Sequence, residues 1–110
     1  PGVLSLNINS KSALYAAYMP FLNNGGLFVP TPKTYNLGDE VFMLLQLMDD
    51  PTRHPVAGRV VWVTPPGAQG GKTPGVGVQF SDDEAGKGLR GRIEQILAGH
   101  LGSNRPTHTL

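Results

Sequence analysis

Two stretches of the chain decide its fold class: Pro-Val-Ala-Gly-Arg-Val-Val-Trp at residues 55–62 and Gly-Val-Gly-Val-Gln-Phe at residues 75–80. In the second stretch Val76, Val78 and Phe80 alternate with glycine and glutamine, which is the period of a β-strand with one buried face. The first stretch is rich in β-branched residues and carries the only tryptophan. Together they predict two strands of an apolar sheet.

The strand that contains the first stretch is expected at residues 56–64, with Val60 and Trp62 on one face. A Gly/Pro-rich segment at residues 65–74 separates it from the second stretch. Part of that segment, residues 67–73, resembles a phosphate-binding loop, but the glycine that such a loop needs is replaced by Pro66. A strand follows where a helix would be required, so we interpret the segment as a hairpin loop and do not expect Lys72 to bind nucleotide.

The remaining pattern is that of several short strands closed by one helix. Further strands are predicted at residues 3–8, 27–29 and 40–48, a helical turn at residues 11–18 and a helix after residue 81. Ser81 and Glu84 have the spacing of a capping box. Apolar residues at helical spacing then mark the buried face: Leu89, Ile93, Ile96, Leu97 and Leu101.

These elements predict a mostly β protein: a small antiparallel β-barrel with a C-terminal α-helix and a short helical turn after the first strand. With 110 residues, of which 15 are glycine and 10 proline, the chain has room for one domain with many turns. We place the domain at residues 1–102 and a tail without periodicity at residues 103–110.

Composition and charge argue against several classes of function. Nine basic and eight acidic residues give a net charge of +1, without the basic excess of a nucleic-acid-binding protein. The longest apolar run, residues 41–45, is too short to cross a membrane, and no signal peptide is visible at the start. We therefore expect a cytoplasmic protein that neither binds nucleic acid nor inserts into a membrane.

No set of residues predicts catalysis, a cofactor or a metal site. The chain has no cysteine, and its three histidines have no metal-ligand neighbours at the usual spacing. The acidic groups at residues 49–50 and 82–84 stand where turns and helix caps need them. No serine has the setting of a nucleophile. We expect a protein that is not an enzyme.

An aromatic stretch after the first strand has two interpretations. Tyr15 and Tyr18 are three residues apart and share a helical face, and Met19 and Phe21 extend it. These side chains either plug one end of the barrel or form a surface for a protein partner, because such residues are enriched in interfaces. The tail residues Arg105, Pro106, Thr107 and His108 are expected beside this patch or at a second partner.

Four segments of the chain resemble the PilZ domain family: Gly-Gly-Leu-Phe-Val at residues 25–29, Gly-Asp-Glu-Val at 38–41, and the two stretches at 55–62 and 75–80. The resemblance spans roughly residues 3–100. It implies a barrel fold and a link with cyclic di-GMP, which most members bind through an Arg-x-x-x-Arg segment and an Asp/Asn-x-Ser-x-x-Gly motif. Arginine suits this ligand because it forks onto phosphates and stacks on bases.

The ligand motifs of the family are degenerate in this chain. Phe21 stands at the acidic position, Asn23 at the serine position, and only Gly26 is retained, while no arginine precedes Arg53. The resemblance therefore implies no cyclic di-GMP binding.

Residues 14–21 and 105–110 instead resemble the branch of the family that acts in type IV pilus assembly. That branch implies an adaptor for the assembly ATPase PilB and the cyclic di-GMP receptor FimX in twitching motility. Two alternatives stay open: a direct cyclic di-GMP receptor with an altered site, and a small ligand-binding barrel or enzyme.

Overall fold

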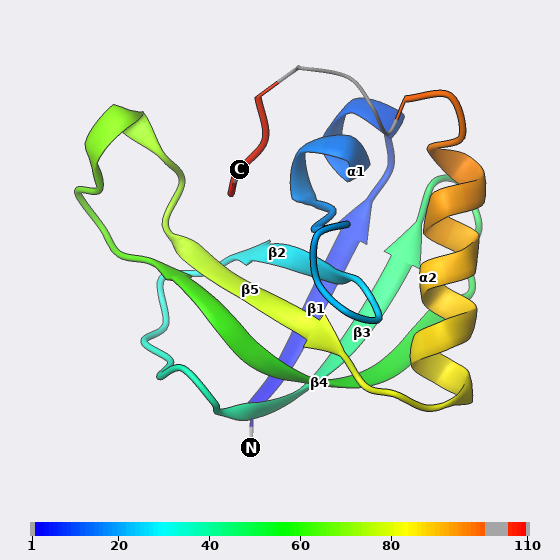
Figure 1. Cartoon of the computed structure of the whole chain (residues 1–110), viewed down its shortest axis with the longest axis horizontal. Coiled ribbons are helices and arrows are strands. Elements are labelled where there is room, and N and C mark those ends of the chain that lie inside the picture. Colours follow the sequence, from blue (N-terminus) through cyan, green and yellow to red (C-terminus); the bar gives the residue numbers. More distant parts are fainter. Residues whose placement is uncertain (1, 101–105, 110) are drawn as a thin grey trace.

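The computed structural model describes residues 2–100 and 106–109, and five strands dominate it. The sheet has the order β1-β3-β4-β5-β2, and it curls strongly into a half-barrel (Figure 1). Its strands are β1 (Gly2–Ile8), β2 (Gly26–Pro30), β3 (Glu40–Leu47), β4 (Arg53–Thr64) and β5 (Gly75–Phe80). The predicted fold class is confirmed, although one pair, β1 with β3, is parallel rather than antiparallel.

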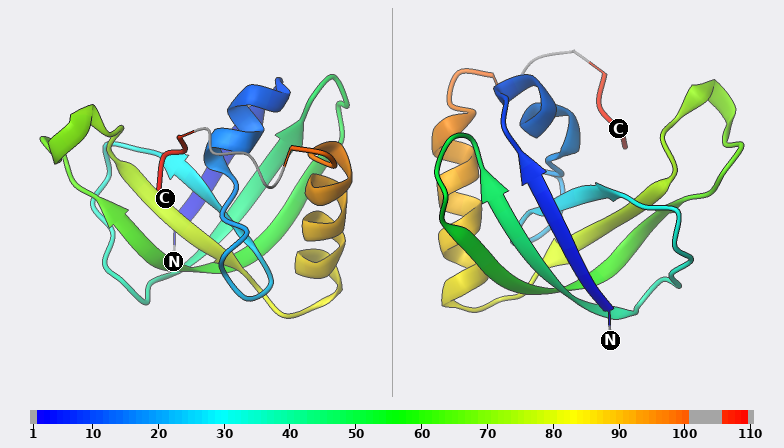
Figure 2. Two further views of the ribbon diagram at one scale, coloured as in Figure 1. Left: turned by 45° about the horizontal axis from the view of Figure 1, so that its top comes forward. Right: turned by 180° about the vertical axis from the view of Figure 1, so that it is seen from behind.

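Two α-helices cover the concave side of the sheet (Figure 2). Helix α1 (Lys11–Ala17) begins at Ser10, whose hydroxyl accepts a hydrogen bond from the Ala13 N–H at 3.1 Å. Helix α2 (Glu84–Ile96) is the predicted C-terminal helix, and a short 3₁₀ turn, η1 (Gln69–Gly71), lies in the loop between β4 and β5. Both α-helices follow the strand-and-helix order that the sequence predicts.

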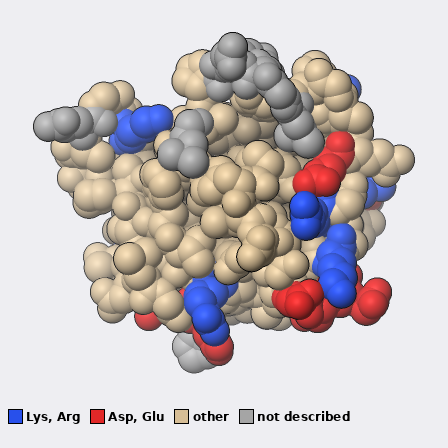
Figure 3. All heavy atoms as spheres, viewed as in Figure 1, with Lys and Arg blue, Asp and Glu red and all other residues tan. Residues whose placement is uncertain are grey.

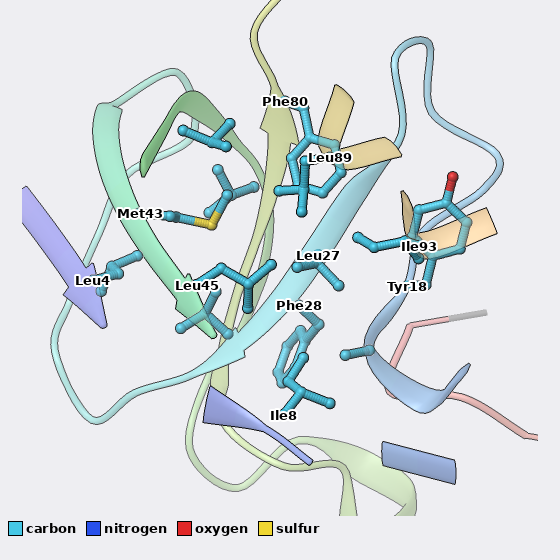
Figure 4. Packing of buried hydrophobic residues seen from close by; sticks show 14 of the residues in the cluster. Leu4, Ile8, Tyr18, Leu27, Phe28, Met43, Leu45, Phe80, Leu89 and Ile93 are labelled. Carbon is cyan, nitrogen blue, oxygen red and sulfur yellow. The ribbon is translucent and has the colours of Figure 1, made fainter. Parts of the chain in front are cut away.

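One core joins the helices to the inner face of the sheet. Strand β3 alternates buried and exposed residues along its length, as expected for a sheet with one face on the core. In α2, Leu89, Ile93 and Leu97 are at most 3% exposed, and Figure 4 shows the first two pointing toward the strands. The predicted apolar face of this helix is therefore the face that packs on the sheet.

Strand β4 differs from the expected alternation at one point. Val60 pairs with Val78, but Trp62 pairs with the next residue of β5, Gly77, so that Val61 is an extra residue in the ladder. Such a β-bulge shifts the alternation by one residue. The prediction that Val60 and Trp62 share a face is therefore wrong: Val60 faces the core, and Trp62 lies on the opposite face.

The start of α2 also differs from the expected capping box. The N-cap is Asp83, whose carboxylate accepts a hydrogen bond from the Gly86 N–H at 2.8 Å, and not Ser81. Ser81 supports the cap instead, because its hydroxyl donates to the same Asp83 oxygen at 2.9 Å. These bonds lower the pKa of Asp83 and hold the carboxylate in its charged form at the positive end of the helix.

The glycines of α2 have different roles, which substitution will distinguish. A Cβ at Gly86 would collide with the carbonyl oxygen of Ser81, whereas Cβ atoms at Gly88 and Gly91 would meet open space. We expect Gly88→Ala and Gly91→Ala each to stabilise the fold by about 0.5–1 kcal/mol, because alanine is the better helix former. Gly86→Ala should instead destabilise it, as measured by urea unfolding. Stabilisation by all three substitutions would contradict the tight packing at Gly86.

Candidate partner-binding surface

Tyr18 belongs to the core and not to the surface. Its backbone pairs with Leu27 of β2, its side chain is 1% exposed, and its hydroxyl donates a hydrogen bond to Oε2 of Glu94 at 2.5 Å. The side chain therefore ties the segment after α1 to helix α2. This position agrees with the interpretation of the aromatic stretch as a core element, and it removes Tyr18 from the exposed contacts.

The partner of Tyr18, Glu94, is a residue that the sequence analysis did not single out. Arg90, one turn earlier on α2, lies 3.3 Å from the same Glu94 oxygen. The hydrogen bond from Tyr18 and the positive charge of Arg90 lower the pKa of Glu94, while burial and this carboxylate raise the pKa of Tyr18. Nothing in the helical pattern marks Glu94, because the Tyr18 contact joins residues 76 positions apart.

Met19 is buried on the other face of β2 and β5. Its N–H donates to the Gly26 carbonyl at 2.9 Å, and its side chain is fully buried. A Cβ at Gly77 would lie 2.8 Å from the Met19 sulfur and 2.7 Å from Cβ of Trp62. The thioether and the indole therefore flank a glycine of β5, and Met19 supports the outer surface without being part of it.

Residues 106–109, the part of the tail that the structure describes, lie against this same region (Figure 1). The His108 ring stacks on Phe28 of β2, with ring centroids 4.9 Å apart, and the backbone N–H of His108 donates to the Ala16 carbonyl at 2.9 Å. Lys72 donates from Nζ to the Thr107 carbonyl, also at 2.9 Å. The described tail residues therefore lie beside α1, and the side chain of Lys72 is hydrogen-bonded to the tail backbone.

The environment of His108 favours its neutral form. Burial, and secondarily the positive charge of Lys72, lower the pKa of His108 below its ordinary value of 6.5. Protonation below that value therefore weakens the packing of the tail, because the released tail takes up the proton more readily. Of the other tail residues in question, Pro106 is exposed and Thr107 is partly buried, whereas Arg105 lies outside the described residues.

The degenerate motif forms the turn between α1 and β2. Phe21 is 47% exposed, and the backbone carbonyl of Asn23 accepts a hydrogen bond from the Gln79 side chain at 2.8 Å. Gly26 is needed for packing alone, because a Cβ there would lie 2.6 Å from the Val78 carbonyl oxygen. Retention of this glycine therefore does not by itself indicate a ligand site.

A hollow of about 600 Å³ lies beside this turn, across the outer face of three strands. Arg59 lines it, but so do the carboxylates of Glu40 and Asp82, and Phe42 contributes an exposed ring. One guanidinium beside two carboxylates offers little attraction to a ligand with two phosphate charges. The hollow thus combines one basic side chain with two acidic ones.

The face that carries the turn and the tail is largely uncharged. In Figure 3 charged side chains gather along α2 and at the lower margin, and a further basic side chain lies at the upper left, while the centre of this view is occupied by other residues. Phe21 and Pro20 are exposed, and Tyr15 is partly buried against the core. Depletion of charge around exposed aromatic side chains is typical of the centre of a protein–protein interface.

The described part of the chain holds no group of three or more His, Asp or Glu residues arranged for a metal ion. One member of each acidic group noted in the sequence binds the backbone: Asp50 accepts from the Thr52 N–H at 2.9 Å, and Asp83 caps α2. Among the described residues, no helix combines the length and apolarity that a membrane span requires.

A family model described as PilZ domain matches residues 3–99. No curated protein matches the chain.

The Tyr18–Glu94 hydrogen bond predicts a pH-dependent loss of stability on Tyr18→Phe. At pH 7 the substitution should cost about 1–2 kcal/mol, because the Glu94 carboxylate loses the phenol hydrogen bond and keeps only the contact with Arg90. Since the pKa of Glu94 is lowered in the folded state, this stabilisation is present above its ordinary value of 4.5 and is lost as the pH falls through the folded value.

Urea unfolding of the wild type and of Tyr18→Phe at pH 7 and pH 3.5 measures the difference in the free energy of unfolding. The control is Glu94→Gln, in which the cost of Tyr18→Phe should no longer depend on pH. An equal cost of Tyr18→Phe at both pH values would contradict the assigned role of ionised Glu94.

Proposed function

Because this chain belongs to the PilZ domain family, we propose that it is a non-catalytic adaptor in type IV pilus biogenesis and twitching motility. Membership of the family indicates a role connected with cyclic di-GMP signalling, as a receptor or an adaptor. The adaptor role is supported by the uncharged face on which the turn at Phe21, helix α1 and the tail converge. Its partners in this proposal are a PilB-like assembly ATPase and a FimX-like cyclic di-GMP receptor in the cytoplasm.

The contact residues that we propose are those at the surface of this face: Tyr15, Phe21, Pro106, Thr107 and His108. Tyr18 and Met19 contribute indirectly, because their side chains are buried and hold the backbone next to Phe21 in place. Arg105 completes the proposed set from the sequence alone. An adaptor works through contact area and needs no catalytic group.

The alternative is a direct cyclic di-GMP receptor with an altered site. Its support is the hollow beside the turn, which contains Arg59. Against it stand Phe21 and Asn23 at the motif positions and the lack of arginine before Arg53. Each missing charge-assisted hydrogen bond lowers the affinity by roughly 1.5–3 kcal/mol.

Truncation of Phe21 tests the proposed surface. Phe21→Ala should weaken binding to a PilB-like or FimX-like partner by about tenfold or more while the thermal midpoint stays nearly unchanged, because an exposed aromatic anchor contributes to binding and little to the core. Leu37→Ala is the matched control: Leu37 is 67% exposed in the turn before β3. Tyr18→Ala should instead lower the midpoint strongly. Unchanged affinity of folded Phe21→Ala would remove this residue from the interface.

The second test is calorimetry with cyclic di-GMP. No saturable heat is expected at micromolar concentrations, because the charged contacts that hold the ligand elsewhere in the family are missing. A saturable heat in the low micromolar range would support the receptor instead. Loss of that heat in Arg59→Ala would then assign it to the hollow.

A further inference from the structure

Strand β1 forms one end of the sheet and is paired on one side only. It pairs with β3, and in the described chain no other strand pairs with it (Figure 2, right). The carbonyl of Ile8 points to β3, where it accepts a hydrogen bond from the Met48 N–H at 2.7 Å. Because these directions alternate along a strand, the N–H and C=O groups of Val3, Ser5 and Asn7 point to the open side.

This edge lacks the features that normally keep strand edges apart. Residues 2–8 contain neither a charged residue nor a proline, and β1 is seven residues long. Val3 is 58% exposed, and its register neighbour in β3, Phe42, is 41% exposed. The outer face next to the open edge is therefore apolar at one end, and the edge itself is a complete template for another strand.

We propose that this edge is occupied by the same edge of a second copy of the chain, forming a two-fold symmetric dimer with a continuous sheet. Two identical edges related by a two-fold axis perpendicular to the sheet pair as antiparallel strands. The register that uses the whole strand places Ser5 opposite its own copy and Val3 opposite Asn7. These are the residues whose backbone groups point outward, so each forms a hydrogen-bonded antiparallel pair.

Charge complementarity supports a second copy as the occupant. Glu40 stands beside the start of β1, because it directly precedes Val41, the partner of Gly2. Lys11 follows the end of β1 at the beginning of α1, and both side chains are exposed. Antiparallel pairing brings the Lys11 end of one copy to the Glu40 end of the other, twice by symmetry. Neither residue forms an ion pair within the described chain.

Sedimentation velocity tests the proposal. The whole chain is measured over a wide concentration range, together with variants that place a charge at Ser5, next to the proposed two-fold axis. The wild type should pass from monomer to dimer as its concentration rises, as expected for a small interface. Ser5→Lys and Ser5→Glu each place like charges opposite one another and should raise the dissociation constant by about fivefold. An equimolar mixture of the two variants should dimerise again. Ala57→Lys, on the exposed face of the central strand β4, is the control.

Amide hydrogen exchange gives an independent readout that needs no variant. The amides of Val3, Ser5 and Asn7 should become protected as the wild-type concentration rises, while those bonded to β3 stay protected throughout. A wild type that remains monomeric up to millimolar concentration overturns the proposal, even if a different protein proves to add a strand there. Failure of the mixed variants to recover the dimer overturns the two-fold pairing at Ser5.

Discussion

The position of one buried tyrosine determines how the helices and the sheet fit together. Tyr18 continues the sheet beyond β2 through its backbone and reaches α2 through its hydroxyl. Because its phenol is surrounded by the core, its polar end needs a partner, and Glu94 supplies it. Three of the thirteen residues of helix α2 are glycines, which weaken a helix. The Tyr18–Glu94 bond fixes this helix to the segment that follows α1.

The outer surface depends on this same arrangement. The backbone after Tyr18 turns outward, so that Met19 packs over β5 while Phe21 points into solvent. The tail then covers Phe28, which would otherwise present a bare ring beside α1. One short segment therefore contributes both buried side chains and exposed ones. A substitution in it acts on stability or on binding according to which side its side chain occupies.

Much of the fold could be predicted from the sequence, because strand periodicity and helix periodicity depend on neighbouring residues. All five strands and both helices follow from such local patterns, and so does the buried face of α2. The bulge at Val61 could not be seen, since an extra residue in a ladder is defined by the partner strand. The cap at Asp83 could not be predicted either, because Ser81 and Asp83 are both good caps and only the structure shows that Asp83 accepts the bond from the Gly86 N–H. In the candidate site, a position of the tail beside the aromatic stretch was one of two expectations, but its individual contacts and the role of Glu94 were missed, because each contact joins residues distant in sequence.

Some glycines of this chain leave no room for a side chain, and they show why a family model can match a sequence through its fold. At Gly26, Gly77 and Gly86 a single methyl group would meet backbone or side-chain atoms, whatever the protein binds. Selection for folding alone is enough to keep these positions. A family match that rests on such residues therefore reports the fold and gives no direct information about the ligand. The residues that the fold requires and the residues that contact a ligand or a partner can therefore change independently.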